Sequence, residues 1–192
     1  MPDKLPRIFW NVVSIIFWLF STLFLFYLMN NPDLPGIISR LGILGPAVVV
    51  FLFAVTAATP VSAEILLLSS GALFGPLIGS LTNIVGILIS SMIEYYFGEK
   101  LFDAKTFART QKKLPAALRK LPVESPLFLI GGKLLPWIGA KMVNLAAGAY
   151  RVPLSRQIWT SLIACLPGAL FWGIGGNRLM LLFKTLLSDF NF

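Results

Sequence analysis

The sequence has no histidine, a single cysteine and few charges, which together amount to 12% of its residues. The lack of histidine removes the commonest metal ligand and the usual proton acceptor at neutral pH. Cys165 has no second cysteine to pair with, so the chain contains no disulfide framework. Because a soluble domain carries roughly 25% charged residues, the composition also argues against a soluble fold.

Hydrophobic residues make up 57% of the 192 residues, and the mean hydropathy is +0.83. These values are typical of a single integral membrane domain. The formal net charge of +8 would suggest nucleic acid as a partner of a soluble protein. Here the basic residues lie beside apolar segments, so we expect anionic lipid headgroups as partners and no nucleic acid.

Residues 1–44 are interpreted as an N-terminal unit. Lys4 and Arg7 precede the uncharged run Ile8–Met29, which is long enough to cross a bilayer core of about 30 Å. The apolar core of a signal peptide has only about 7–15 residues, so we expect an uncleaved transmembrane helix. The turn-rich segment Asn30–Arg40 follows it and is expected to be external.

A first membrane repeat is expected over residues 45–98. The arms Pro46–Ala58 and Val61–Leu73 flank Pro60, which interrupts a helix, and together they predict a re-entrant hairpin. A spanning helix, Leu77–Phe97, comes next. The expected breaks at the end of the hairpin are Gly71, Gly75 and Pro76.

Residues 99–125 form a basic segment with interleaved apolar residues, typical of an amphipathic segment at a membrane surface. The positive-inside rule predicts that this loop and the basic N-terminus are both cytoplasmic. We expect anionic headgroups along 100–120 and a location in the inner (plasma) membrane of a bacterium. The basic residues are Lys100, Lys105, Arg109, Lys112, Lys113, Arg119 and Lys120.

A second repeat is expected over residues 126–177. A re-entrant hairpin, Pro126–Ala149, contains helix breaks at Pro136 and Gly139, and the uncharged run Gln157–Asn177 predicts the last spanning helix. Residues 178–192 are interpreted as a short surface segment, since Met180–Leu187 is too short to cross.

The two repeats share a sequence pattern. Gly-Ala-x-x-x-Pro-Leu begins at Gly71 and again at Gly148, 77 residues later. The same offset places Glu64 at the position of Lys141. We therefore predict an all-α integral membrane protein in which two hairpin-plus-helix units have opposite orientation. Helix breaks at corresponding places of two such halves are typical of a transporter binding site.

Two sequence blocks resemble the DedA superfamily, in particular its VTT-domain, or SNARE-associated Golgi protein, branch. The first block is Pro60-x-x-x-Glu64 with the stretch Ser69–Gly79, and the second is Gly132-Lys133-Leu134-Leu135-Pro136 with Val143-Asn144-x-x-Ala147-Gly148. The resemblance covers residues 45–177. It implies two opposed re-entrant hairpins and a role in moving or scrambling lipids. The family usually has arginine where Lys133 stands, and lysine lacks the bidentate fork that grips phosphate.

Four residues are candidates for substrate or ion binding: Glu64, Lys133, Lys141 and Asn144. A carboxylate inside a membrane is functional by default, so Glu64 could carry a coupling proton, or it could form a structural ion pair with either lysine. Lys133 could hold a lipid phosphate, or it could form the structural pair with Glu64. Lys141 could extend to the interface, and the structural alternative for Asn144 is that it caps or cross-links helices. Glu94 is expected to reach cytoplasmic water near a helix end.

The leading function is therefore a lipid transporter, flippase or scramblase that acts on a phosphate-bearing lipid, with proton coupling left open. The alternative is a non-transporting membrane-organising protein whose basic loop recruits partners or anionic lipids. No nucleophile lies beside a base in a recognisable pattern, so we expect no enzymatic activity, no metal and no cofactor. The sequence leaves a homo-oligomer open.

Overall fold

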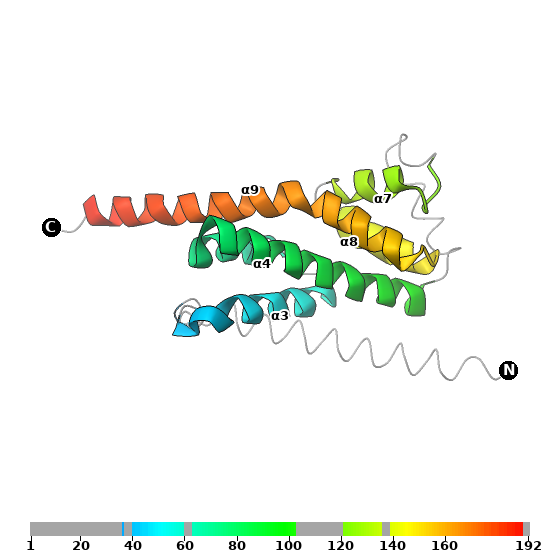
Figure 1. The fold of residues 1–192 in the computed structure, drawn as a ribbon, viewed down its shortest axis with the longest axis horizontal. Coiled ribbons are helices and arrows are strands. Elements are labelled where there is room, and N and C mark those ends of the chain that lie inside the picture. Colours follow the sequence, from blue (N-terminus) through cyan, green and yellow to red (C-terminus); the bar gives the residue numbers. More distant parts are fainter. Residues whose placement is uncertain (1–35, 37–39, 60–62, 103–120, 136–138, 190–192) are drawn as a thin grey trace.

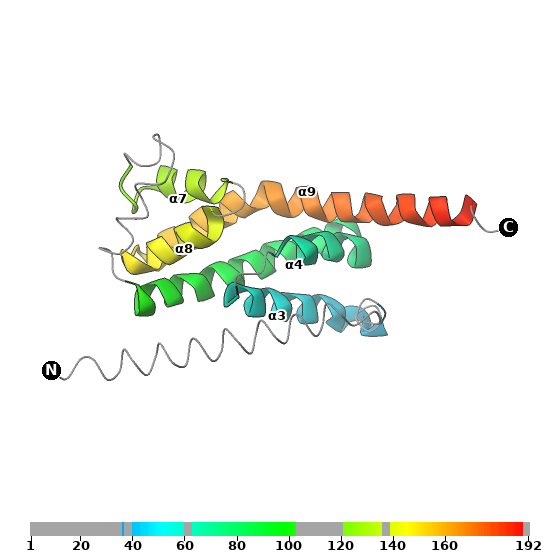
Figure 2. The same ribbon diagram turned by 180° about the vertical axis from the view of Figure 1, so that it is seen from behind.

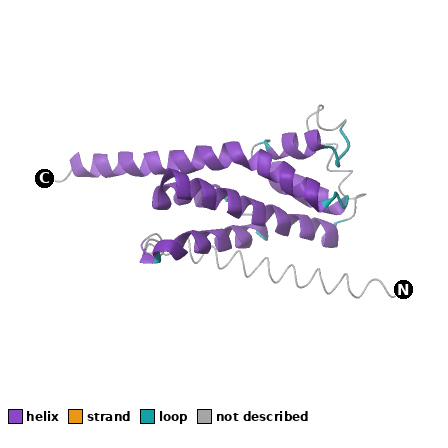
Figure 3. Ribbon diagram, in the orientation of Figure 1, coloured by secondary structure: helices purple, strands orange, loops and turns teal. Residues whose placement is uncertain are grey.

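The computed structural model describes residues 36, 40–59, 63–102, 121–135 and 139–189, and every regular element in these ranges is a helix (Figure 3). The short 3-10 helix η1 (Gly42–Leu44) leads into α3 (Gly45–Ala57). The long helix α4 (Glu64–Leu101) follows. The second half contains α7 (Pro126–Lys133), α8 (Gly139–Ala149) and α9 (Leu154–Asp189). The expected all-α class is confirmed for the described residues.

Helix α4 is the element against which the others pack. It contacts α3 on one side and α8 and α9 on the other, and α7 lies against α8 and α9 (Figures 1 and 2). The C-terminal part of α9 extends past the rest of the bundle (Figure 1). This arrangement brings residues from all five helices towards the middle of α4.

A sharp bend divides α4 at Gly75, whose φ of 78° and ψ of 177° are open almost only to glycine. Pro76 comes next, and its missing N–H leaves no donor unsatisfied at the bend. The chain then folds back on itself, and a hydrogen bond joins the two arms: the amide of Asn83 donates to the carbonyl of Leu67 over 3.0 Å. A turn between two helical arms is therefore present at Gly75 and Pro76, whereas Gly71, where a break was also predicted, has helical backbone angles and lies within the first arm.

The outer surface of the bundle is apolar. Ile43, Leu77 and Phe171 are 94%, 73% and 68% exposed. Two helices, Glu64–Leu101 and Leu154–Arg178, are long and apolar enough to cross a membrane. Exposed apolar side chains on such helices have a natural partner in lipid, as expected for a membrane protein.

Glycines 77 residues apart make corresponding close contacts. At Gly71 the arm before the bend approaches the backbone of Trp172 and Gly173 in α9, leaving no room for a Cβ atom. At Gly148, α8 approaches the backbone of Tyr95 and Glu99 in α4 in the same way. The contacted residues Tyr95 and Trp172 are also 77 residues apart. Each arm therefore packs on the long helix of the other half.

A second pair of glycines, on the long helices α4 and α9, makes close contacts with the arms of the other half. Gly98 of α4 lies against the carbonyl of Leu145, and Gly176 of α9 lies against the carbonyl of Leu68. Leu68 and Leu145 again differ by 77 residues, whereas Gly98 and Gly176 differ by 78, and Gly175, which the offset pairs with Gly98, has no atom within 4 Å of an added Cβ. The reciprocal packing thus follows the sequence offset at Gly71 and Gly148 and departs from it by one residue at the second pair of glycines.

Polar groups fix both ends of the α7–α8 unit. The Ser125 side chain accepts a hydrogen bond from the N–H of Phe128, and Pro126 occupies the first turn of α7. After α8, the hydroxyl of Tyr95 donates to the carbonyl of Val152 over 2.8 Å. This bond ties the turn between α8 and α9 to α4.

Several sequence-based boundaries agree with the helices and others do not. The predicted starts and ends at Pro126 and Ala149 coincide with those of α7 and α8. The separate C-terminal segment is a continuation of α9, which runs to Asp189. The predicted N-terminal helix, Pro60, Pro136 and the basic residues 103–120 lie outside the described residues.

We expect Gly148→Ala to lower the free energy of unfolding by about 1–3 kcal/mol, because the new methyl group meets backbone atoms that have no rotamer to change. Thermal unfolding of the detergent-solubilised protein measures this. The matched control is Gly175→Ala, where no atom lies within 4 Å and alanine is the better helix former. Equal effects of the two substitutions would contradict the close approach at Gly148.

Candidate functional site

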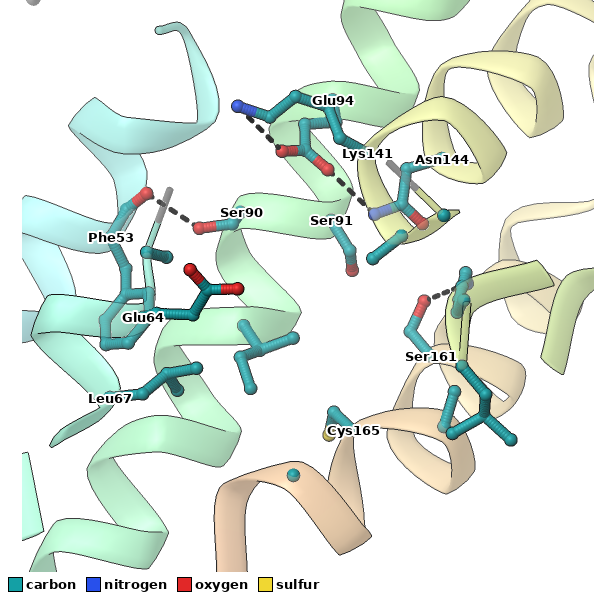
Figure 4. Close-up of a pocket in the computed structure, with 18 of the residues that line it drawn as sticks. Phe53, Glu64, Leu67, Ser90, Ser91, Glu94, Lys141, Asn144, Ser161 and Cys165 are labelled. Atoms are coloured by element: carbon teal, nitrogen blue, oxygen red, sulfur yellow. Dashed lines mark hydrogen bonds and ion pairs between the residues drawn. The ribbon is translucent and has the colours of Figure 1, made fainter. Parts of the chain in front are cut away.

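A cavity of about 440 Å³ lies where α3, α4, α7, α8 and α9 meet. Its lining is mostly apolar but includes two carboxylates, Glu64 and Glu94, and two lysines, Lys133 and Lys141. Figure 4 shows Glu64, Glu94 and Lys141 around this space, with Asn144 next to Glu94. An ionisable cluster inside an apolar bundle is costly and is functional by default.

Lys133 ends α7 and reaches α9. Its ammonium group donates to the amide oxygen of Gln157 over 3.3 Å and to the hydroxyl of Ser161 over 2.5 Å. Gln157 and Ser161 are one helical turn apart on α9, so their side chains share one face. Within the described residues, both partners of Lys133 are neutral.

Two buried amides connect Lys133 to α4. Gln157 donates to the side-chain oxygen of Asn144 over 2.8 Å, and Asn144 donates to the carboxylate of Glu94 over 2.8 Å. Gln157, Asn144 and Glu94 are 0%, 3% and 6% exposed. Buried polar groups are stable when their hydrogen bonds are made, and this chain satisfies both ends of each amide.

Lys141 completes the chain on the side of α3. Its ammonium group lies 3.7 Å from the carboxylate of Glu94. It also donates to the carbonyl of Thr56 over 3.1 Å and to that of Thr59. These carbonyls lie at and just after the C-terminal end of α3, where the helix dipole favours a cation.

The local sequence explains why these side chains converge. Lys141 and Asn144 are three residues apart on α8 and therefore lie on the same face. Ser90 donates to the carbonyl of Phe53 over 2.7 Å and holds α3 against the stretch of α4 that carries Glu94 (Figure 4). The site thus depends on helix faces from both halves of the chain.

The structure brings the four sequence candidates together and adds a buried carboxylate, Glu94, that the sequence interpretation placed in water. Glu64, Lys133, Lys141 and Asn144 all line the cavity, and Glu64 is exposed within it. The sequence interpretation of Glu94 as a water-facing residue is wrong, since its side chain is buried. In the described part of the chain, the carboxylate paired with Lys141 is Glu94 rather than Glu64.

Sequence reasoning also missed Gln157, Ser161 and the carbonyls of Thr56 and Thr59. The sequence did contain an indication that Glu94 is buried and functional, because Glu94 is the only charged residue between Ile65 and Gly98. Gln157 stood at the start of an uncharged run and was taken for a boundary residue. The part of the chain that the structure describes contains no cluster of acidic or cysteine side chains that could hold a metal ion.

The family model of the VTT domain matches residues 59–178, a range that contains the cavity residues of α4, α7, α8 and α9. The chain belongs to the VTT-domain family. This is the domain of the DedA and SNARE-associated Golgi proteins, so the resemblance noted in the sequence is confirmed. Comparison with curated proteins and with solved structures gives no match. This VTT-domain chain is a membrane protein by family and by its two apolar helices.

We expect Asn144→Leu to destabilise the fold strongly, since it removes the acceptor of the Gln157 N–H₂ group and the amide donor to the Glu94 carboxylate, both of which are buried. Each unsatisfied group costs about 1–3 kcal/mol, and a charged group costs more. Thr82→Val is the matched control, because the Thr82 hydroxyl bonds only to the carbonyl of Ile78 in its own helix. Unfolding in detergent should show a loss for Asn144→Leu that clearly exceeds the control. Similar losses would mean that the amide chain contributes little.

Proposed function

We propose that this VTT-domain chain is a lipid transporter of the flippase or scramblase type that acts on a phosphate-bearing lipid. The observation that supports it is a cavity that contains two lysines and two carboxylates, inside a bundle whose outer surface is apolar. Such a cavity provides polar contacts for a headgroup while the acyl chains stay in the surrounding lipid.

The energetics favour this use of the cavity. A charge at the centre of a membrane helix costs about 2.5–3.5 kcal/mol on insertion scales, and a charged headgroup that crosses the bilayer core also loses its water. Lysine ammonium groups bind phosphate as point charges, so Lys133 and Lys141 can replace part of the water that a headgroup loses. Glu64 is the candidate for a coupling proton, because it is the exposed carboxylate of the cavity.

The proposed architecture is an inverted repeat, in which each re-entrant hairpin packs on the long helix of the other half. The reciprocal glycine contacts, and the 77-residue offset between Gly71 and Gly148, support it. In this architecture the site lies between two equivalent halves, which can open it to one membrane face and then to the other.

Purified protein in liposomes should accelerate the movement of a labelled phospholipid. We expect Lys133→Ala to lower this rate at least tenfold, because the lysine contacts the headgroup phosphate, and Glu64→Gln to flatten its dependence on pH. Arg178→Ala is the control, since Arg178 is an exposed basic residue outside the cavity and outside the basic segment. Wild-type protein that gives no flux above protein-free liposomes would instead favour the membrane-organising role.

The proposed orientation places the basic loop in the cytoplasm of the inner membrane and the segment 30–40 outside. Single cysteines at Ser39 and Thr110, in a Cys165→Ser background, should react with an impermeant thiol reagent from opposite sides of the membrane. In intact cells only the Ser39→Cys protein should be labelled, and in inverted vesicles only Thr110→Cys. Labelling of both from one side would contradict the inverted repeat.

A further inference from the structure

The two lysines of the cavity have different electrostatic surroundings. Lys141 lies 3.7 Å from the Glu94 carboxylate and also donates to backbone carbonyls at the end of α3. Among the described residues, Lys133 contacts the amide oxygen of Gln157 and the hydroxyl of Ser161, both of which are neutral. The positive charge of Lys141 is thus balanced by a bonded anion, and that of Lys133 is not.

The amide chain between the lysines has a fixed direction. Lys133 can only donate, so Gln157 must present its oxygen to Lys133 and its N–H₂ to Asn144. The Glu94 carboxylate can only accept, so Asn144 must present its N–H₂ to Glu94 and its oxygen to Gln157. The charges at the two ends therefore determine the orientation of both amides.

We infer that Glu94, Asn144 and Gln157 form a directional chain that positions Lys133 to bind the headgroup phosphate and keeps Lys141 neutralised as a structural link to α3. Asn144 and Gln157 are positioning residues in this scheme, and Lys133 with Ser161 forms the phosphate-binding group. The inference rests on the proposed lipid-transport function and specifies which lysine performs it.

This division of roles has a chemical basis. A phosphate that approached Lys141 would have to compete with a carboxylate that is already bonded and buried. A phosphate that approached Lys133 would displace only neutral acceptors, and a charge-assisted bond is roughly twice as strong as a neutral one. The Ser161 hydroxyl can rotate and donate to the same phosphate.

The first test reverses the donor and acceptor order of the hydrogen bonds between residues 94, 144 and 157, and it uses no lipid. In Gln157→Glu, residue 157 can no longer donate to Asn144, and turning Asn144 over would place its oxygen against Glu94. Adding Glu94→Gln removes this conflict, because a glutamine at position 94 can donate to Asn144 and accept from Lys141. We expect Gln157→Glu to lower the melting temperature in detergent by about 4 °C or more. The double variant Glu94→Gln/Gln157→Glu should return to within about 2 °C of the wild type.

The second test asks which lysine then binds the anion. The probe is dihexanoyl phosphatidic acid, a short-chain lipid phosphate, and its Kd is obtained from the concentration dependence of the melting temperature. In the wild type, Lys133→Met should raise this Kd at least about tenfold. In the double variant the negative charge lies next to Lys133, so Lys133→Met should change the Kd less than about twofold. Lys141→Met should now raise it at least about tenfold.

The outcomes separate this inference from the proposed function. A double variant no more stable than Gln157→Glu alone would overturn the directional chain, whether or not lipid binds. Binding that depends on Lys133 equally in the wild type and the double variant would overturn the division of roles while leaving lipid transport intact. Wild-type protein that neither binds the lipid phosphate nor moves phospholipid would overturn both. Inorganic phosphate in place of the lipid shows whether the headgroup alone is bound.

Discussion

The buried contact between Asn144 and Glu94 is the interaction on which the rest of the site depends. It joins α8 to α4 through an amide and a carboxylate that are both almost fully excluded from solvent. A carboxylate in such a position persists only if hydrogen bonds and opposite charge replace the water it has lost. Asn144 provides the hydrogen bond to Glu94, and Lys141 provides the opposite charge. Gln157, on α9, continues the hydrogen-bonded chain from Asn144 to Lys133. The polar chain therefore links five helices, α3, α4, α7, α8 and α9.

The sequence predicted much of the architecture because its signals were local. Gly75 and Pro76 mark a bend through backbone conformation, which depends on few neighbours. The start at Pro126 follows from proline and serine chemistry in the same way. The match between Gly71 and Gly148 was also visible, and both residues lie where two backbones touch.

The candidate site was only partly predictable, because partners depend on which helix faces meet. Lys133, Lys141 and Asn144 stood out as polar residues in apolar surroundings, and all three line the cavity. Glu94 was misplaced, since distance from a helix end does not reveal that α8 covers that part of α4. Gln157 and Ser161 were missed because a neutral residue at the start of an apolar run looks like a boundary. The basic segment and the breaks at Pro60 and Pro136 lie outside the described residues, so those interpretations stay predictions.

The glycine contacts also determine how the helices can move against one another. At Gly71 and Gly148 two backbones touch with no side chain between them, so no interlocked rotamers oppose displacement along the helix axes. Small residues at such crossings are typical of membrane helices that approach closely. A displacement at these contacts would be a shear, in which an arm slides by small steps along the long helix of the other half. Because both halves contain the same kind of contact, the crossing at Gly71 and the crossing at Gly148 allow the same kind of sliding.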